Sequence, residues 1–532
     1  MSKRTARPLL ITTAVFLVAV FLAACSSTGA STSSSPTGGD VSIGWAEPVD
    51  SLNPAVTGAR DVGPIDSNIF DGLVWLTPAL KATPHLATSW KISPDGKTYT
   101  FTLEKGVKFQ DNTAFNASSV VANIKYITAK TTQSTIAIGL LGPCLQAKAV
   151  SEYPVEIDCS TPYAPLLNHL GEPDLGMQSP AAITKWGADL GMHPTGTGPF
   201  EFVSYVPNQS VVLKRNPAYN WAAPATGVKG PAKLSKLTFN IVTDSQARVA
   251  SLQSGQTQMI QETPGIYFKS LKNTFTQVRV PISGQGIFAP INASKFPTND
   301  LAVRQAILLS VNKKTLIQAS AQGVFSPTYA PLVGMPDYSV KSLSSMYPYD
   351  PKKADQLLIK DGWSKTGKYW TKGGKELDLS ITAISTVPAY PLVAQALQSQ
   401  LQANGMNVTV SQLATPAWLN SNVNGDMSLT PLQYVAADPA ALDLWFTPGQ
   451  YYNWSHYTNP KLTALIKAGE ATSVISQREK IYAQAQTLIM QEAVMLPLYQ
   501  NEDLVLTSKK LNGITYAGGG FEYFLGATLS KS

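Results

Sequence analysis

Residues 193–219 read HPTGTGPFEFVSYVPNQSVVLKRNPAY and form the most informative stretch of this chain. Two glycines and a proline, within 196–199, come before an alternation of apolar and polar residues that begins at Phe200. This pattern predicts a tight turn that leads into a half-buried strand. A second strand is predicted over 211–215, after the turn at 207–209. The stretch therefore predicts a β-hairpin, in which glycine and proline serve turn geometry and no side chain has the character of a nucleophile, base or metal ligand.

Several further motifs accompany this hairpin. The segments PTGTGPFEF and VVLKRNPAY resemble those that mark the extracytoplasmic substrate-binding proteins of ABC importers in the peptide/nickel (oligopeptide-binding) family 5. Other segments resemble elements of that family in the same order: 84–90, 95–103, 106–109, 246–255, 299–307 and 349–358. No single motif is specific, but their shared order covers nearly all of 41–506.

The resemblance implies an α/β architecture, the two-lobe periplasmic-binding-protein type II (cluster C) fold with an extra third lobe. The first lobe is expected from 41–78, 191–290 and 505–532, the extra lobe from 79–190, and a closing lobe from 291–504. A chain of 532 residues also exceeds what one hydrophobic core usually serves. The implied function is capture of a small-molecule or peptide ligand by lobe closure and its delivery to permease subunits, by a monomer with no cofactor.

The amino terminus has the pattern of an export signal over residues 1–24. Lys3, Arg4 and Arg7 come before an apolar run that is short for a bilayer span. The run ends in Leu-Ala-Ala-Cys25, which resembles the lipobox of bacterial lipoproteins, in which the cysteine becomes lipidated. Residues 25–40 are then mostly Ser, Thr and Gly and are expected to form a flexible tether. A lipid on Cys25 would hold the protein at the outer face of the cell membrane. The alternative is a plain signal peptide in which Cys25 has no role.

Charge and cysteine content restrict the function further. The 41 Lys and Arg only modestly exceed the 34 Asp and Glu and are dispersed, so no nucleic-acid partner is expected. Charged residues are 14% of the chain while aromatic residues are plentiful, which suits a neutral ligand and also ordinary cores. In an exported chain, Cys144 and Cys159 are expected to form a structural disulfide, with two free thiols as the alternative.

The ligand's charge is a separate question. In peptide-binding members of the resembled family, an acid three residues before an Asp/Glu-Pro pair holds the ligand's amino group. The pair here is Asp438-Pro439, and the position three before it is Val435. No arginine lies at 390–393, where dipeptide-binding members offer one to the ligand carboxylate. Both absences favour a neutral ligand, such as a glycoside or a blocked peptide, unless Asp438, Glu47 or Asp50 makes the ion pair from another direction.

Aromatic rings with neutral or acidic partners are the candidates for the ligand cleft, because aromatic faces bind sugars and apolar groups alike. The expected ligand-binding residues are Trp45, Trp418, Gln433, Tyr434, Asp438 and Trp445. For each tryptophan, core packing is the alternative interpretation.

The sequence also bears on two other classes of function, metal transport and enzymatic catalysis. Nickel is another cargo of the resembled family. The four histidines, at 85, 169, 193 and 456, are scattered along the chain, so no site that binds a metal ion directly is expected. Binding of a metal ion held by a small-molecule chelator is the remaining alternative. No hydrolase or nucleotide-binding motif occurs, so an enzyme is not expected and a secreted hydrolase is a remote alternative. A peptide chaperone or a signal receptor with the same fold is a stronger alternative than a hydrolase.

Overall fold

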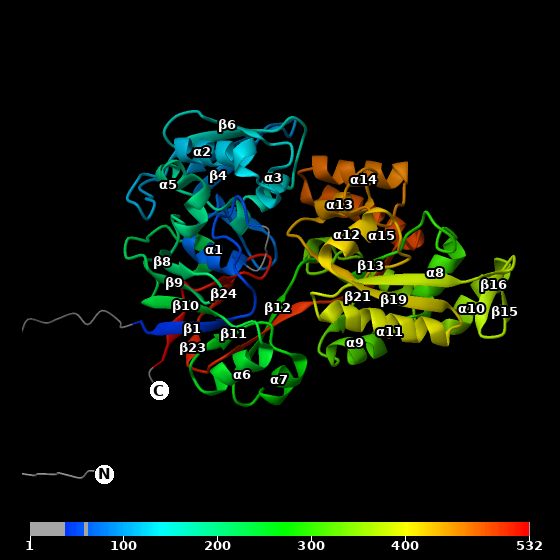
Figure 1. Ribbon diagram of the computed structural model, residues 1–532. Helices are drawn as coiled ribbons and strands as arrows, with labels where there is room; N and C mark the ends of the chain where they lie inside the picture. The colour runs from blue at the N-terminus through cyan, green and yellow to red at the C-terminus, as the bar shows by residue number, and fades with distance from the viewer. Residues whose placement is uncertain (1–37, 58–61, 531–532) are drawn as a thin grey trace, which may run out of the picture. The chain divides into compact units, whose positions relative to one another are not determined.

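The computed structural model describes residues 38–57 and 62–530. The signal peptide 1–24, Cys25 and most of the tether lie outside these ranges. Three sheets of four or more strands organise the described chain (Figure 1). None of the helices in these ranges is long and apolar enough to span a bilayer.

The first sheet has seven strands in the order β12-β22-β11-β1-β10-β9-β8. Its strands and its helices are β1 (Asp40–Trp45), β8 (Phe200–Val206), β9 (Ser210–Arg215), β10 (Lys236–Ile241), β11 (Met259–Ile260), β12 (Thr276–Pro281), β22 (Glu502–Thr507), α1 (Gly63–Ile69), α6 (Ser245–Gln253) and α7 (Gly265–Ser270). β1 pairs in parallel with β10 and β11 at its centre. At one edge β8 pairs antiparallel with β9, which confirms the predicted hairpin.

The second sheet lies within the expected extra lobe, in the order β4-β5-β7-β6. This region contains β2 (Val74–Leu76), β3 (Ala82–Pro84), β4 (Ala87–Ile92), β5 (Thr98–Leu103), β6 (Gln146–Ala149), β7 (Pro154–Asp158), α2 (Ala117–Thr128), α3 (Ile136–Leu141), α4 (Leu166–His169) and α5 (Pro180–Trp186). A disulfide joins Cys144 and Cys159 across the β6–β7 hairpin. Asn116 caps α2, since its side chain accepts from the backbone N–H groups of Ser118 and Ser119.

The third sheet has the order β14-β21-β13-β20 and lies beside a parallel pair, β18 and β19. The four strands of the sheet are β13 (Gly284–Pro290), β14 (Ser326–Pro327), β20 (Leu432–Val435) and β21 (Met495–Gln500), and the separate pair is β18 (Asp378–Ile384) and β19 (Asn407–Leu413). The sequence pattern predicts a strand over 377–384, a helix over 392–404 and a strand over 408–413, which together make a βαβ unit. α11 (Ala389–Ala403) connects the parallel strands β18 and β19 and confirms this unit.

Helices cover both faces of this third sheet (Figure 1). One face packs against α8 (Leu301–Ser310), α9 (Lys313–Ala321), α10 (Pro351–Lys360) and α11, and the other against α12 (Thr415–Val423), α13 (Leu442–Phe446), α14 (Pro460–Ala471) and α15 (Ile475–Gln491). The remaining strands are short: β15 (Ser364–Thr366), β16 (Tyr369–Lys372), β17 (Lys375–Glu376), β23 (Leu511–Asn512), β24 (Thr515–Tyr516), β25 (Glu522–Tyr523) and β26 (Thr528–Leu529).

The chain passes directly between the first and third sheets at two neighbouring points. β12 pairs in the first sheet and is followed by β13 in the third, with only residues 282 and 283 between them. β21 returns to β22 through Asn501, whose carbonyl accepts from the backbone N–H of Ile282 at 3.4 Å. The strand pairing therefore places 284–290 with the third sheet and 502–504 with the first.

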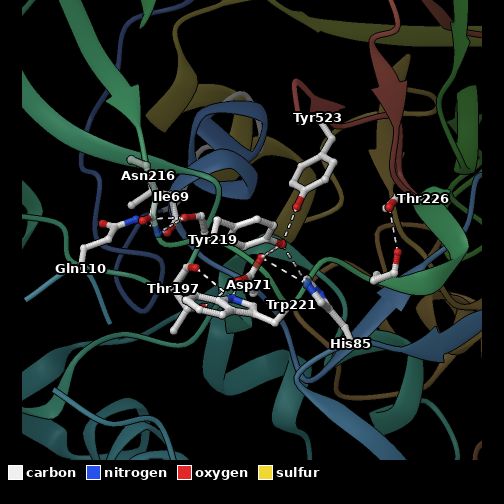
Figure 2. A network of polar contacts seen from close by, with 12 residues as sticks. Ile69, Asp71, His85, Gln110, Thr197, Asn216, Tyr219, Trp221, Thr226 and Tyr523 are labelled. Atoms are coloured by element: carbon white, nitrogen blue, oxygen red, sulfur yellow. Dashed lines mark hydrogen bonds and ion pairs between the residues drawn. The ribbon is translucent and has the colours of Figure 1, made fainter. Parts of the chain in front are cut away.

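The hairpin at 193–219 is fixed by a buried carboxylate from another part of the chain (Figure 2). Asp71 accepts hydrogen bonds from Thr197 Oγ1 at 2.8 Å, Trp221 Nε1 at 3.1 Å and Tyr219 Oη at 3.2 Å. His85 Nε2 lies 3.3 Å from the same carboxylate. Asp71 is 1% exposed, so these donors supply the hydrogen bonds that water would give to an exposed carboxyl group. The apolar spacing of residues 65, 69 and 73 predicts a helix over 66–73. The helix observed, α1, ends at Ile69, which leaves Asp71 in the loop that meets the hairpin.

Close backbone approach explains the two glycines at the start of the hairpin. A Cβ added at Gly196 would lie 2.1 Å from the carbonyl oxygen of Ile69, and one at Gly198 would lie 2.6 Å from the same atom. No side chain fits at either distance, so α1 and the hairpin contact each other through backbone. Gln110 joins them from the second region, since its Nε2 donates to the carbonyl oxygens of Ile69 and Phe200 (Figure 2).

A buried lysine at the start of α9 makes folding sensitive to pH. Lys313 is 7% exposed, donates through Nζ to the carbonyl of Thr328 at 2.7 Å and lies 4.2 Å from the ring centroid of Tyr329. Burial lowers the pKa of Lys313 from 10.5 to about 7. Between these two pH values the unfolded chain holds a proton that the folded chain does not.

We therefore expect this lysine to make the free energy of unfolding rise with pH, by at most about 1.4 kcal/mol per pH unit between about pH 7 and 10. A Lys313→Met variant lacks this contribution. Urea denaturation of both proteins across that range measures the difference between their slopes. Parallel curves would show that Lys313 keeps its proton in the fold.

Candidate functional site

Three of the expected ligand-binding aromatic residues come together beside the third sheet. Tyr434, on β20, and Trp445, on α13, have ring centroids 5.5 Å apart. Trp454 lies 5.4 Å from Trp445 and 5.0 Å from Trp418 of α12. Trp418 and Trp445 are 7% and 1% exposed and belong to one apolar cluster. These rings therefore form a packed aromatic wall, in which each contributes to the core.

The structure places Trp45 and Gln433 apart from this wall. Trp45 ends β1 in the core of the first sheet, where its ring packs edge-on against Phe239 at 5.4 Å. Gln433 neighbours Tyr434 in β20, but its Oε1 accepts from Asn501 Nδ2 at 3.0 Å and its backbone N–H donates to Tyr390 Oη. Gln433 therefore contacts the crossing between the first and third sheets.

Asp438 is committed to an internal ion pair. Its two carboxylate oxygens accept from Arg478 Nη1 at 2.8 Å and Nη2 at 2.6 Å, and both side chains are 3% exposed or less. Oδ1 also caps the following turn by accepting from the backbone N–H of Ala440. Burial acts to raise the pKa of Asp438, but the Arg478 charge and its hydrogen bonds outweigh burial, so the pKa is lowered overall. Asp438 is thus an ionised carboxylate whose charge Arg478 already balances.

A pocket of about 350 Å³ lies next to this ion pair. We call it the junction pocket, because residues between 79 and 168 form one side and residues between 335 and 478 form the other. Its lining is 79–82, Ile92, Ala164, Leu167 and Asn168 on the first side, and 335–338, Ala437, Ser473, Ile475 and Arg478 on the second. Its volume is within the range of small-molecule sites. None of the six expected ligand-binding residues lines it, although Ala437 and Arg478 connect it to Asp438.

Two hydrogen bonds join the sides of the junction pocket. Asn168 Nδ2 donates to the carbonyl of Ala437 at 3.4 Å, and the backbone N–H of Ala164 donates to the carbonyl of Glu470 at 2.7 Å. Burial, followed by the nearby Asp443 carboxylate, raises the pKa of Glu470 to about 7, although Lys467 bonds to it. The two sides of the pocket therefore also contact each other directly.

Sequence reasoning missed Arg478 and Asn168. A buried acid at a helix start needs a cation, so Asp438 could have prompted a search for one, but nothing in the spacing singles out Arg478 forty residues later. The histidines have structural contacts, such as His169 Nδ1 with the carbonyl of Leu140 at 2.7 Å. Within 38–57 and 62–530 no group of three or more His, Cys, Asp or Glu is arranged to hold a metal ion.

The sequence has relatives of known class. Residues 81–453 match the family described as bacterial extracellular solute-binding proteins, family 5 middle. The glutathione-binding protein GsiB of Pectobacterium atrosepticum is 30% identical over 461 residues, which cover 84% of this chain and 86% of that protein. The chain belongs to solute-binding protein family 5. A second GsiB, from Salmonella typhimurium, is 27% identical over 463 residues, with the same coverage of 84% and 86%.

Solved family 5 structures show the same fold. NikA from Brucella suis, in complex with Fe(III)-EDTA, has a TM-score of 0.82 at 23% identity and covers 92% of this chain and 100% of its own. DppA from Helicobacter pylori, in complex with the peptide STSA, has a TM-score of 0.75 at 24% identity, with coverage of 93% and 99%. The expected type II periplasmic-binding-protein fold is confirmed.

Membership of family 5 confirms the expected class of function. The chain is a substrate-binding protein of the ABC-importer type. The family is extracytoplasmic, and its members are ligand-binding components that work with permease subunits. The relatives are solute-binding proteins, which are not enzymes.

Proposed function

We propose that this protein captures a small organic solute that carries no free ammonium group at its point of contact, and delivers it to an ABC permease. Closure of the lobes about residues 282–283 and Asn501 would trap the solute, and the protein would act as a monomer without enzymatic activity. The lobe division 41–283 with 502–532, against 284–501, is part of this proposal, with 79–190 as the extra lobe.

The pairing of Asp438 with Arg478 carries the proposal of a neutral ligand. Asp438 was the nearest acid that could replace the carboxylate missing at Val435. Both of its oxygens are bonded to Arg478 at 2.6–2.8 Å, so a ligand ammonium would have to displace a buried guanidinium. Arg478 in turn has a balanced charge and offers little attraction to a ligand carboxylate. A glycoside, a blocked peptide or another neutral molecule fits this balance.

A glutathione-like peptide is the second candidate. The GsiB proteins, named for glutathione binding, are similar to this chain over most of its length. The ammonium group of a free peptide would need a carboxylate partner other than Asp438. The aromatic wall at Trp418, Tyr434 and Trp445 would then have to lie against a charged solute.

Anchoring at the outer face of the membrane through Cys25 is also part of the proposal. The lipobox-like sequence before Cys25 and the Ser/Thr/Gly tether up to residue 40 support it. Lipidation adds hydrocarbon mass to the mature amino terminus, which starts at Cys25.

Native mass spectrometry of gently purified protein tests both parts. We expect the solute released on denaturation to lack a free amino group, and the protein taken from membranes to begin at an acylated Cys25. Release of free-amine peptides would overturn the argument from Asp438. An unmodified amino terminus at any other residue would exclude the anchor.

A further inference from the structure

The polar groups on the inner wall of the junction pocket already have protein partners. Arg478 makes four hydrogen bonds, two to Asp438, one through Nε to the carbonyl of Gly469 at 2.8 Å and one to Tyr338 Oη at 3.2 Å. Asn168 donates across the pocket to Ala437. The deepest charge is therefore neutralised, and a polar solute would gain little by replacing these bonds.

Apolar side chains make up most of the remaining lining. Leu80 and Met335 are 9% and 4% exposed, and Ile92, Leu167 and Ile475 complete the surface with several alanines. The charged residues Lys81 and Asp337 are exposed, so they belong to the solvent side of the pocket. The interior of the pocket is therefore apolar, and the one charged side chain deep in its lining, Arg478, is balanced by Asp438.

We propose that the junction pocket binds the apolar body of the captured solute. This inference rests on the proposed function and narrows it: the ligand is a neutral amphiphile, such as a blocked peptide with a large apolar side chain, and not a sugar. Its apolar part would contact Leu80, Leu167 and Ile475, and its polar part would extend toward solvent, near Lys81.

The location of the pocket gives such a ligand a second effect. One side is formed by 79–92 and 164–168, the other by 335–338, Ala437 and 473–478. An occupant would bury apolar surface on both sides at once, where the bonds from Asn168 to Ala437 and from Ala164 to Glu470 already join them. Binding would therefore favour the arrangement in which the two sides are together.

N-Phenyl-1-naphthylamine, a neutral apolar dye that fluoresces when it leaves water, is a direct probe of the full protein. We expect saturable binding of one dye per chain. Ile475→Glu places a charge in the lining and Ala79→Trp fills the pocket from an exposed position, so both should weaken dye binding by at least about tenfold. Ile475 is 50% exposed, which lets the variant keep the fold. The matched control is Ile359→Glu, at a 61% exposed residue of α10 outside the lining.

Each result decides the inference. Weakened binding in both lining variants, with the control unchanged, supports it. Absence of saturable binding to the parent protein, or equal binding by Ile475→Glu and the parent, overturns it. The solute identified by native mass spectrometry separates this inference from the proposed function: a neutral sugar would overturn the inference alone, whereas a free-amine peptide would overturn both.

Discussion

Replacement of Asp438 with alanine is expected to lower the free energy of unfolding by about 3–5 kcal/mol. The variant leaves Arg478, with a side chain only 3% exposed, as an uncompensated charge in the interior. Tyr338 Oη and the carbonyl of Gly469 still accept from the guanidinium, but neither carries a charge. Urea denaturation monitored by tryptophan fluorescence measures the loss.

The double variant Asp438→Ala, Arg478→Met is the control. It removes both charges and should recover most of the stability, because a buried ion pair contributes less than the loss of one partner costs. A double variant as unstable as Asp438→Ala would show that the packing of these side chains, not their charge, matters.

Acid gives an independent check on this pair. The pKa of Asp438 is lowered in the fold, so its contribution to stability is fully present above the unfolded value of about 3.9 and is lost as pH falls through the folded value. The difference in stability between the parent and Asp438→Ala should therefore shrink in strong acid. A difference that stays constant down to about pH 2 would contradict this assignment.

Replacement of Asp71 with alanine is expected to lower the free energy of unfolding by about 3 kcal/mol, because it removes three hydrogen bonds that contribute about 1 kcal/mol each. The donors concerned are Thr197, Tyr219 and Trp221. Thr197 Oγ1 loses its acceptor, whereas Trp221 Nε1 still donates to the carbonyl of Thr197 and Tyr219 Oη still bonds to Tyr523 Oη. Chemical denaturation of the parent and the variant measures the effect.

Glu201→Ala is the matched control on the same hairpin. Glu201 forms an ion pair with Lys214, whose side chain is 60% exposed, so removal of this carboxylate should cost at most about 1 kcal/mol. Equal losses of stability in the two variants would mean that removal of any carboxylate in contact with the hairpin has the same effect. The hydrogen bonds of Asp71 would then have no special role.

The sequence predicted those parts of the fold that local patterns encode. The hairpin at 200–215 and the βαβ unit from Asp378 to Leu413 follow from turn residues and apolar periodicity. The end of α1 was misplaced because Asp71 is held by distant donors, which helix periodicity does not reveal.

The candidate site was harder to predict, since it depends on which side chains meet. Trp418, Tyr434 and Trp445 come together in one apolar cluster, but Trp45 packs in another core. A tryptophan in sequence has the same character in a core as in a cleft. The lining of the junction pocket is largely Ala, Leu and Ile, residues that no motif distinguishes from ordinary interior positions.

The two crossings also bear on how such a protein can be recombined. Pro281 pairs with Glu502 in the first sheet, so the segment between them starts and ends at adjacent positions. In genetic terms it is a cassette inserted between two neighbouring strands, whose ends lie about 5 Å apart. Exchanging this cassette between relatives would require two junctions at one place on the sheet, and would combine the closing half of one binding protein with the base of another.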